Sequence, residues 1–365
     1  MNILTINSGS SSLKASLFMA DGTRHDRQHR FQQNALDEAL PAAFEDLRQF
    51  YSAHRIDAIG HRFVHGGNCP DAARMLDAAE VKRLTAIADL APLHMPANLA
   101  GVDFCRQHFN APQFACFDNA FHQTLPESAW RLPVPKKFGL RRYGFHGINY
   151  AYIARQLPDL LGDTAYKNVL IAHLGSGASI CLLQNLQSVA TSMGFSPAGG
   201  IPMATRSGDL DPGVMLKLAA QSDIKTLTDM VFHQMGLLAL SDGESADMAT
   251  LLKSDTPQAA FAVDYFCDQV RGAIGHYAAQ FGGLDAIVFT AGIGEHAGDI
   301  RQKIIQPLGF MGFVLDASKN VQHQLAIHHE NSKPVLMVPA DEAAEMTTLV
   351  SEFIDKQAVN LQTRR

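Results

Sequence analysis

Two stretches of the chain repeat the same strand, turn and strand pattern, and this repeat constrains the fold more than any other feature. Residues 2–18, NILTINSGSSSLKASLF, place an apolar run on each side of a small-residue turn. Residues 168–183, NVLIAHLGSGASICLL, do the same. Two β-prone apolar runs joined by Gly and Ser predict a β-hairpin. A hairpin that occurs twice predicts two related halves.

Further strands and helices are expected after each hairpin. The expected strands are 57–67, 113–123, 285–295 and 334–342. Apolar residues at helical spacing predict helices, and these are 35–51, 76–90, 146–157, 212–221, 256–281, 298–307 and 342–357. Strands that alternate with helices predict an α/β fold with helix-covered sheets. We expect domains at 1–150 and 151–365, a ligand cleft between them, and a last helix, from about residue 343, able to pack on either.

Composition excludes several classes of protein. The chain has 365 residues, 47% hydrophobic, and a net charge of −6, which argues against a disordered chain and a nucleic-acid binder. No apolar stretch reaches the roughly 18 residues of a membrane helix, and the first residues lack the pattern of a signal peptide. The cysteines are scattered and odd in number, at Cys69, Cys105, Cys116, Cys181 and Cys267. That usage fits reduced structural thiols in the cytoplasm.

Each hairpin turn is a candidate phosphate site. The turn between Asn7 and Ser12 offers small residues and hydroxyl groups, with Lys14 just beyond it. Backbone amides, hydroxyls and an ammonium group are donors that suit phosphate. The turn at 173–177, HLGSG, matches it in the second half, where its glycines permit close backbone approach. Ordinary hairpin turns with a surface lysine explain the same residues.

A third glycine-containing segment, TAGIGEH at 290–296, follows an expected strand and precedes an expected helix. This context predicts a glycine turn at a helix N-terminus, which is a natural anion or nucleotide site. It resembles a dinucleotide-binding fingerprint only loosely, because its third glycine, Gly298, is one residue late. A dehydrogenase is therefore the least favoured hypothesis.

Charged side chains in apolar or glycine-rich surroundings are the sharper candidates. Arg62 lies inside an apolar strand, and Arg206 lies in the turn-rich stretch ATRSGDLDPG. Two guanidinium groups directed at one cleft suit a carboxylate and a transferring phosphoryl group. Asp118 follows the strand QFACF and is suited to a metal or a proton, and His146 is framed by glycines in RRYGFHG. Glu342 follows the last strand, where a helix's first turn also favours acids.

Nine segments together resemble the motifs of the acetate kinase family and occur in the family's order. They are NSGSSSLK, GHRFVHGG, APLHMPANL, FDNAFHQTLP, RRYGFHG, HLGSGAS, TSMGFSP, TRSGDLDPG and FTAGIGE. The resemblance covers nearly the whole chain and implies membership of the acetate and sugar kinase, Hsc70 and actin superfamily. It implies a duplicated ββαβαβα core of the ribonuclease H-like, actin-like ATPase type, with ATP between two domains. It also implies a homodimer.

The resemblance further implies roles at matching positions. The catalytic residues would be Asp118, His146 and Arg206. The carboxylate of acetate or acetyl phosphate would bind Arg62, and its methyl group would be lined by Val64, Leu93, Phe145 and Pro197. Mg²⁺, for which Mn²⁺ is an expected substitute, would be positioned by Asn7 and Glu342. The phosphates of ATP or ADP would face Lys14, Ser10, Ser12, His173, Leu174, Gly175, Ser176 and Gly177. The adenosine would lie against Asp247, Met248, Ala249, Gly292, Ile293, Gly294, Glu295 and His296.

The implied activity is reversible, Mg²⁺-dependent, in-line transfer of the γ-phosphoryl group of ATP to acetate, giving acetyl phosphate and ADP. Such transfer depends mainly on positioning and charge neutralisation, which arginines, a histidine and Mg²⁺ supply. The chain departs from the family's usual residues at Ser176, Ala190, Gly199, Ala204, Met248, Ala249 and His296. Two alternatives stay open. One is a kinase for propionate or another short-chain acid, since one methylene is worth only about 1–3 kcal/mol. The other is a non-catalytic nucleotide-binding protein on the same fold.

Overall fold

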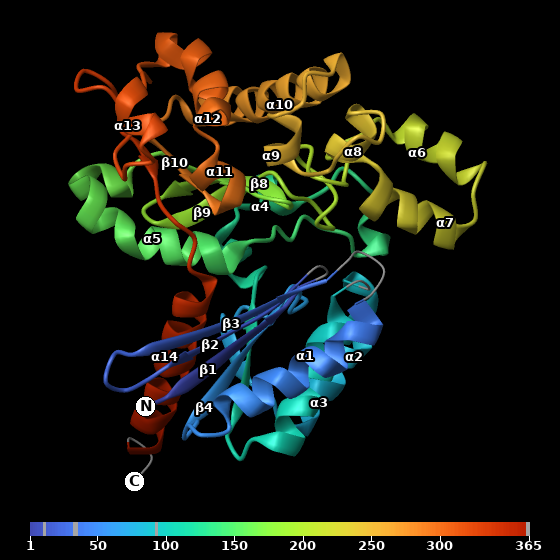
Figure 1. Ribbon diagram of the computed structural model, residues 1–365, viewed down its shortest axis with the longest axis vertical. Coiled ribbons are helices and arrows are strands. Elements are labelled where there is room, and N and C mark those ends of the chain that lie inside the picture. The colour runs from blue at the N-terminus through green and yellow to red at the C-terminus, as the bar shows by residue number, and fades with distance from the viewer. Residues whose placement is uncertain (10–11, 32–35, 92–93, 363–365) are drawn as a thin grey trace. The chain divides into compact units, whose positions relative to one another are not determined.

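The computed structural model describes residues 1–9, 12–31, 36–91 and 94–362. It divides into two compact units, which are drawn together in Figure 1. Unit 1 comprises Met1–Phe121, His146–Tyr152 and Asp341–Arg365, and unit 2 comprises His122–Phe145 and Ile153–Ala340. The domain boundary at residue 150 stays a prediction. Among the described residues, no helix combines the length and the apolar character that crossing a membrane requires.

Unit 1 contains a six-stranded sheet in the order β3-β2-β1-β4-β6-β5. Its strands are β1 (Ile3–Ser8), β2 (Ser12–Phe18), β3 (Arg24–Arg30), β4 (Ala58–Phe63), β5 (Ala73–Met75) and β6 (Gln113–Phe117). Its helices are α1 (Leu36–Tyr51), α2 (Ala78–Ala86), α3 (Met95–His108) and α14 (Glu342–Gln362). The helix α5 (Gly147–Leu161) begins in this unit.

Unit 2 contains a five-stranded sheet in the order β11-β10-β7-β8-β9. Its strands are β7 (Val169–Leu174), β8 (Ala178–Gln184), β9 (Gln187–Thr191), β10 (Ala286–Thr290) and β11 (Val335–Met337). Its helices are α4 (Glu127–Trp130), α6 (Pro212–Ala219), α7 (Ile224–Asp229), α8 (Gly236–Leu240), α9 (Met248–Leu251), α10 (Pro257–Phe281), α11 (Ala291–His296), α12 (Gly298–Ile305) and α13 (Ala317–Val321).

The two sheets repeat one strand arrangement, which confirms the predicted duplication. In unit 1, β1 pairs antiparallel with β2 and parallel with β4, and β4 pairs parallel with β6. In unit 2, β7 stands in the same relation to β8 and β10, and β10 to β11. A third antiparallel strand, β3 or β9, extends each hairpin. The predicted hairpins are therefore β1–β2 and β7–β8.

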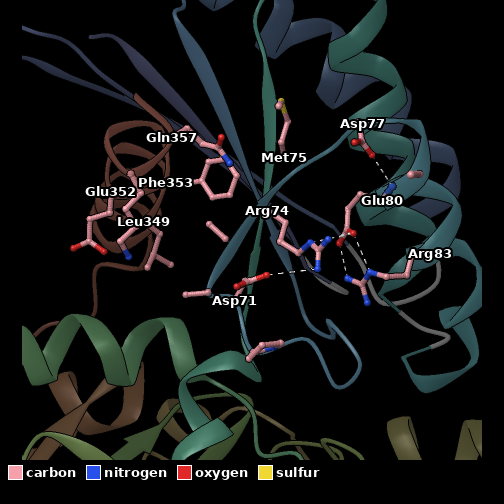
Figure 2. A pocket seen from close by; sticks show the side chains of 15 residues that line it. Asp71, Arg74, Met75, Asp77, Glu80, Arg83, Leu349, Glu352, Phe353 and Gln357 are labelled. Atoms are coloured by element: carbon pink, nitrogen blue, oxygen red, sulfur yellow. Dashed lines mark hydrogen bonds and ion pairs between the residues drawn. The ribbon is translucent and has the colours of Figure 1, made fainter. Parts of the chain in front are cut away.

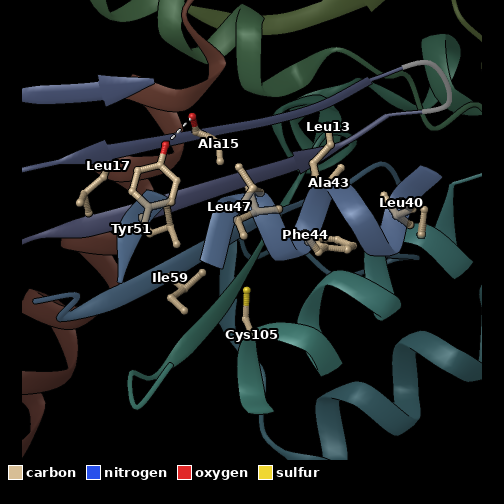
Figure 3. Packing of buried hydrophobic residues seen from close by; sticks show 13 residues of the cluster. Leu13, Ala15, Leu17, Leu40, Ala43, Phe44, Leu47, Tyr51, Ile59 and Cys105 are labelled. Carbon is tan, nitrogen blue, oxygen red and sulfur yellow. Dashed lines mark hydrogen bonds between the residues drawn. The ribbon is translucent and has the colours of Figure 1, made fainter. Parts of the chain in front are cut away.

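The core of unit 1 shows why its segments adopt these structures. Alternate residues of β2, Leu13, Ala15 and Leu17, are buried on one face of the sheet. Buried residues of α1 recur at helical spacing and pack against them (Figure 3). On the opposite face, Met346 and Val350 of α14 pack with residues of β1, β4 and β6. The last helix therefore packs on the unit 1 sheet and brings its first residue to that sheet.

The longest helix, α10, is bounded by the signals that physical chemistry predicts. The Thr256 side chain accepts a hydrogen bond from the amide of Ala259, and Pro257 occupies the first helical position. Gly282, in the left-handed conformation, ends the helix. Buried residues recur every three or four positions along it, so α10 packs one face onto unit 2.

Candidate active site

Four polar side chains meet at one edge of the unit 1 sheet. Asn7 lies in β1, Arg62 in β4, Asp118 directly after β6, and Glu342 at the first position of α14. Arg62 Nε and Nη2 donate to Asp118 Oδ2 at 2.9 and 2.5 Å, and Arg62 Nη1 donates to Asn7 Oδ1 at 3.2 Å. Asn7 Nδ2 donates to Glu342 Oε2 at 2.8 Å. The parallel strands β1, β4 and β6 end at the same edge, which brings these residues together.

The network holds one guanidinium group and two carboxyl groups in a largely buried place. The Asp118 side chain is fully buried, and the Arg62 side chain is 16% exposed. Burial raises the pKa of Asp118, the Arg62 charge opposes this, and the Glu342 charge adds to it, giving a pKa of about 6. Burial acts against the charge of Arg62, but Asp118 and Glu342 outweigh it and raise the Arg62 pKa. The excess negative charge favours an incoming cation.

The second oxygen of Asp118 supports this conclusion. Asp118 Oδ1 is buried and makes no hydrogen bond within the described parts of the chain, although the Ile148 amide also acts to lower the Asp118 pKa. A buried acceptor in this state is suited to a cation or to a group on a substrate. Carboxylate and amide oxygens are the donors that Mg²⁺ prefers. Over the described ranges, no group of three or more His, Cys, Asp or Glu side chains is placed to hold a metal ion.

Asn98 is a residue that the sequence reasoning missed. It lies in α3, is 2% exposed, and donates from Nδ2 to the carbonyl oxygen of Ser8 at 3.0 Å. Ser8 follows Asn7, so this bond fixes the end of β1 beside the network. An asparagine inside the apolar segment MPANLAG was the available signal, because buried amides need partners.

The other predicted residues of unit 1 occupy varied positions. Val64 is buried just after β4, and His146, at a φ of 59°, precedes α5. The next residue, Gly147, donates from its amide to the Asp118 carbonyl oxygen at 2.9 Å, which brings the backbone next to His146 to that of Asp118. Lys14 is exposed on β2, opposite Asn7 in the strand register.

Three further predicted residues lie at or beyond the limits of what the structure describes. Ser12 is the first residue of β2, and its carbonyl oxygen accepts from the Gly9 amide at 2.8 Å. Ser10 and Leu93 lie outside the described residues.

Three predicted segments meet in unit 2. The hairpin turn is closed by a hydrogen bond from the Gly175 amide to the Gly177 carbonyl oxygen at 3.1 Å. The carbonyl oxygen of Ser176 accepts from the amide of Ala204 at 3.1 Å, next to the Arg206 segment. A Cβ built on Gly175 would lie 3.6 Å from the Cβ of Ala291, at the start of α11. The structure thus gathers the second hairpin turn, the Arg206 loop and the 291–296 segment.

Arg206 is held within its loop by backbone contacts. Its Nη1 donates to the carbonyl oxygen of Pro197 at 2.7 Å, which joins two predicted site residues. Its own carbonyl oxygen accepts from the Met203 amide at 2.9 Å. Gly236, with a φ of 66°, lies against the same loop. A Cβ there would meet the Met203 carbonyl oxygen and would lie 2.7 and 2.8 Å from the backbone oxygen and nitrogen of Arg206.

We therefore expect Gly236→Ala to lower the turnover number at least about tenfold, because the added methyl group must displace the backbone of Arg206. The measurement is steady-state kinetics on protein that circular dichroism shows to be folded. Gly243→Ala is the matched control. Gly243 has a φ of 85°, but a Cβ there meets nothing within 4 Å. Equal losses in both variants contradict the expectation, since backbone strain alone then explains them.

The prediction of a glycine turn ahead of a helix at 290–296 is wrong in one respect. Strand β10 ends at Thr290, and α11 begins at once, so Gly292 and Gly294 lie inside this short helix. Ala291, the first residue of α11, has a φ of 66°, in the left-handed region. Glu295 accepts from the amide of Ala340 at 2.9 Å, so its carboxylate already has a structural partner.

Arg301 is a second residue that the sequence reasoning missed. It is fully buried and donates from Nη1 to the carbonyl oxygens of Gly294 and Glu295 at 2.8 and 2.9 Å. Its other nitrogens bond the side-chain and backbone oxygens of Asn320 at 2.7 and 2.6 Å. Burial lowers its pKa to about 10. Arg301 therefore fixes the end of α11, and it lies within a helix pattern that offered no signal of burial.

The remaining predicted residues of unit 2 lie in separate local settings. Asp247 caps α9 by accepting from the Thr250 amide at 2.9 Å; Met248 is buried and Ala249 is exposed. His173 and Leu174 are buried at the end of β7. Phe145 is buried, and its carbonyl oxygen accepts from His122 at 3.0 Å. The His296 side chain is 79% exposed.

An open groove of about 890 Å³ lies elsewhere in unit 1, along β5, α2 and α14. Figure 2 shows its charged side chains, among them Arg74, Glu80 and Arg83. It contains none of the predicted site residues. Its walls are lined by both acidic and basic groups, and we assign it no ligand.

Comparison with known proteins gives one consistent result. Residues 21–348 match the model of the Acetokinase family. An acetate kinase of Rhodopseudomonas palustris (strain ATCC BAA-98 / CGA009) is 37% identical over 354 residues, which is 87% of this chain and 89% of the relative. A propionate kinase of Citrobacter rodentium (strain ICC168) is 38% identical over 370 residues, or 90% and 91% of the two chains.

A solved structure agrees with the sequence relatives. The crystal structure of a propionate kinase from Francisella tularensis subsp. tularensis SCHU S4 matches with a TM-score of 0.86 and 31% identity, covering 95% of this chain and 98% of that one. This likeness confirms the predicted fold class, a duplicated α/β fold of the actin-like ATPase type.

Proposed function

This chain belongs to the acetokinase family, and from that membership we propose that it transfers the γ-phosphoryl group of ATP to acetate, reversibly, giving acetyl phosphate and ADP. The observation that carries the proposal is the buried network of Arg62, Asp118, Asn7 and Glu342. A guanidinium group is the side chain best suited to hold a carboxylate.

The proposed roles follow from the chemistry of the groups. Arg62 holds the acetate carboxylate, so one of its oxygens is oriented for attack on the γ-phosphorus. Arg206 and His146 stabilise the negative charge of the transferring group, and the attacking and leaving oxygens are in line. Asp118, ionised above a pH of about 6, balances the Arg62 charge and orients the guanidinium group through two hydrogen bonds.

Mg²⁺ and the nucleotide have proposed binding residues on this chain. Asn7 and Glu342 would hold Mg²⁺, with Asp118 close by, and Mg²⁺ when bound neutralises phosphate charge; Mn²⁺ is the expected substitute. The phosphates would bind the hairpin turns at Lys14 and 173–177, and the adenosine would bind along 292–296 and 247–249. The hydrogen bond between Ser176 and Ala204 supports a fixed phosphate turn.

Propionate is the second candidate acceptor. Relatives named propionate kinase also match this chain. We place acetate first because Val64, which is 4% exposed, is a branched and well-packed residue. A small apolar wall that favours acetate over propionate does so by a modest factor only, on the order of 10–200-fold per methylene.

We also propose that the protein is a cytoplasmic homodimer. The five cysteines are all unpaired and buried, which fits a reducing compartment. Helices α6 and α7 expose Leu216 and Ile224 at 74% and 79%. Such exposed apolar helices support burial against a second copy.

A hydroxamate assay tests the proposal. Purified protein receives MgATP, hydroxylamine and one carboxylate from a series running from formate to butyrate, with GTP in place of ATP in a parallel set. We expect acyl hydroxamate to form fastest with acetate and to need ATP. A rate that does not depend on any carboxylate contradicts the proposed function, and a maximum at propionate selects the second candidate.

A further inference from the structure

The loop of residues 64–67, which follows β4, is held by an asparagine from another strand end. Asn119 lies one residue after Asp118 and two after β6. Its Oδ1 accepts from the amide of Gly66 at 2.9 Å, and its Nδ2 donates to the carbonyl oxygen of Gly67 at 2.8 Å. A backbone amide needs an acceptor and a carbonyl needs a donor, so this orientation of the carboxamide follows from its partners.

Asn119 is suited to this task because it is fully buried and uses both ends of its amide. Loss of the side chain would leave a buried amide and a buried carbonyl without partners, which costs more than the bonds themselves contribute. The bridge therefore ties the end of β4 to the end of β6. The same two strand ends carry Arg62 and Asp118.

A second side chain, Arg83 of α2, holds the same loop. Arg83 Nη1 donates to the carbonyl oxygen of Gly66 at 2.7 Å. Arg83 is itself fixed by Glu80, through bonds of 2.9 and 2.5 Å, and Figure 2 shows this pair at the groove. The Glu80 side chain is 4% exposed, so it anchors the Arg83 guanidinium group from a buried position.

The loop also packs closely against the aromatic ring of Phe117. A Cβ built on Gly66 would lie 2.7 Å from the ring of Phe117, so the loop backbone runs directly along that ring. His65 Nδ1 accepts from the Gly67 amide at 2.8 Å, and burial lowers the His65 pKa to about 4, which keeps the ring a neutral acceptor near neutral pH. The amides and the carbonyl oxygens of both Gly66 and Gly67 therefore each have a hydrogen-bond partner.

We infer that Asn119 is a positioning residue that fixes the Val64 loop and thereby sets the discrimination between acetate and longer carboxylates. The inference rests on the proposed function, in which Val64 lines the acyl pocket. A wall excludes one methylene only if it cannot retreat, because the energetic difference is small. Asn119 acts through the loop and does not touch the reacting atoms.

The test is kinetic analysis of Asn119→Leu, which keeps the size of the side chain and removes both polar atoms. We expect KM for acetate to rise about tenfold and the acetate-to-propionate ratio of kcat/KM to fall at least about threefold. We expect KM for ATP to stay within about twofold. Amide hydrogen exchange at Gly66 should quicken in the same variant. A merely structural role would lower the melting temperature without moving the substrate ratio.

Two further variants keep the test decisive. Arg83→Met removes the second support and should shift the substrate ratio in the same direction, even where Asn119→Leu does not fold. Asn168→Leu is the matched control. Asn168 also donates to backbone carbonyls, those of Phe281 and Gly283. It lies in unit 2 just before β7, and its two partners lie at the end of α10 and in the link to β10. We expect the control to lose stability and to keep the ratio.

The outcomes separate the inference from the function on which it rests. An active wild-type chain whose ratio is unchanged by Asn119→Leu and Arg83→Met overturns the inference alone. A ratio that shifts equally in Asn168→Leu overturns it too. A folded wild-type chain without carboxylate-dependent activity overturns the proposed function and the inference together.

Discussion

We expect Arg62→Ala to lower the turnover number for acetyl phosphate formation by about 10³-fold or more. The variant loses the group that would hold the carboxylate, and it leaves the buried carboxyl of Asp118 without its cation. Removing one partner of a buried ion pair also costs about 3–5 kcal/mol of stability. The measurement is initial rates at saturating MgATP and acetate, on protein whose fold has been checked by thermal unfolding.

Two controls separate chemistry from folding for this variant. Arg27→Ala removes an exposed arginine on β3, 44% exposed and paired with Asp46, and should keep the wild-type rate. Millimolar guanidinium should restore part of the Arg62→Ala rate, since it supplies the missing group. A folded Arg62→Ala variant with more than a tenth of wild-type turnover contradicts the assigned role.

We expect Asp118→Asn to lower turnover by about 100-fold or more and to stabilise the fold at neutral pH, because the Glu342 charge still offsets that of Arg62. The amide keeps an oxygen for Arg62 but loses the charge that orients it and that faces the cation site. The melting temperature checks the predicted stability, and initial rates on the same preparation check the predicted turnover. A variant that is less stable and still active contradicts this account of the residue.

The predicted gain in stability follows from the pKa of Asp118. Burial has the largest effect and raises that pKa, and the charge of Glu342 adds to the rise. The pKa goes from 3.8 to about 6, although the charge of Arg62 lowers it. The folded state therefore holds the proton more tightly than the unfolded state does. The stabilising effect of this group is full below the unfolded-state pKa and is lost as pH rises through the higher folded-state pKa. Asparagine does not ionise, so the variant does not lose this stability at pH 7.

The same pKa predicts the acid limb of activity. Asp118 is ionised above a pH of about 6 and neutral below it, so kcat/KM for acetate should fall as pH drops through 6. In Glu342→Gln the repelling charge is gone, and the ionisation should move to lower pH. A carbon-13 NMR titration of the labelled Asp118 carboxyl, without nucleotide, shows this directly.

The sequence supported the two hairpins and the strands β4, β6, β10 and β11, because each depends on short-range patterns, but it did not predict β3, β5 or β9. The apolar runs of β1 and β7 and the turns after them are local signals. The strand β3, RHDRQHR, was not predicted, since it has no apolar residues and exists by pairing with β2 at the sheet edge. Its exposed charges protect that edge from further pairing.

The residues that hold the site in place could not be predicted in the same way. Asn98, Asn119 and Arg301 each bond backbone groups that are far from them in sequence or belong to another element. No periodicity marks such a contact, because it depends on which strand ends the fold brings together. The glycines of α11 misled the prediction for a related reason. A glycine marks backbone freedom, and here Ala291 took the positive φ.

The most direct test of the account is phosphorus-31 NMR of the wild-type protein with MgATP and acetate. We expect the γ-phosphate signal of ATP to decrease as an acyl phosphate signal and the signals of ADP appear, with the acyl phosphate absent when acetate is omitted. Growth of inorganic phosphate alone, or an unchanged ATP spectrum from folded protein, would contradict phosphoryl transfer to a carboxylate.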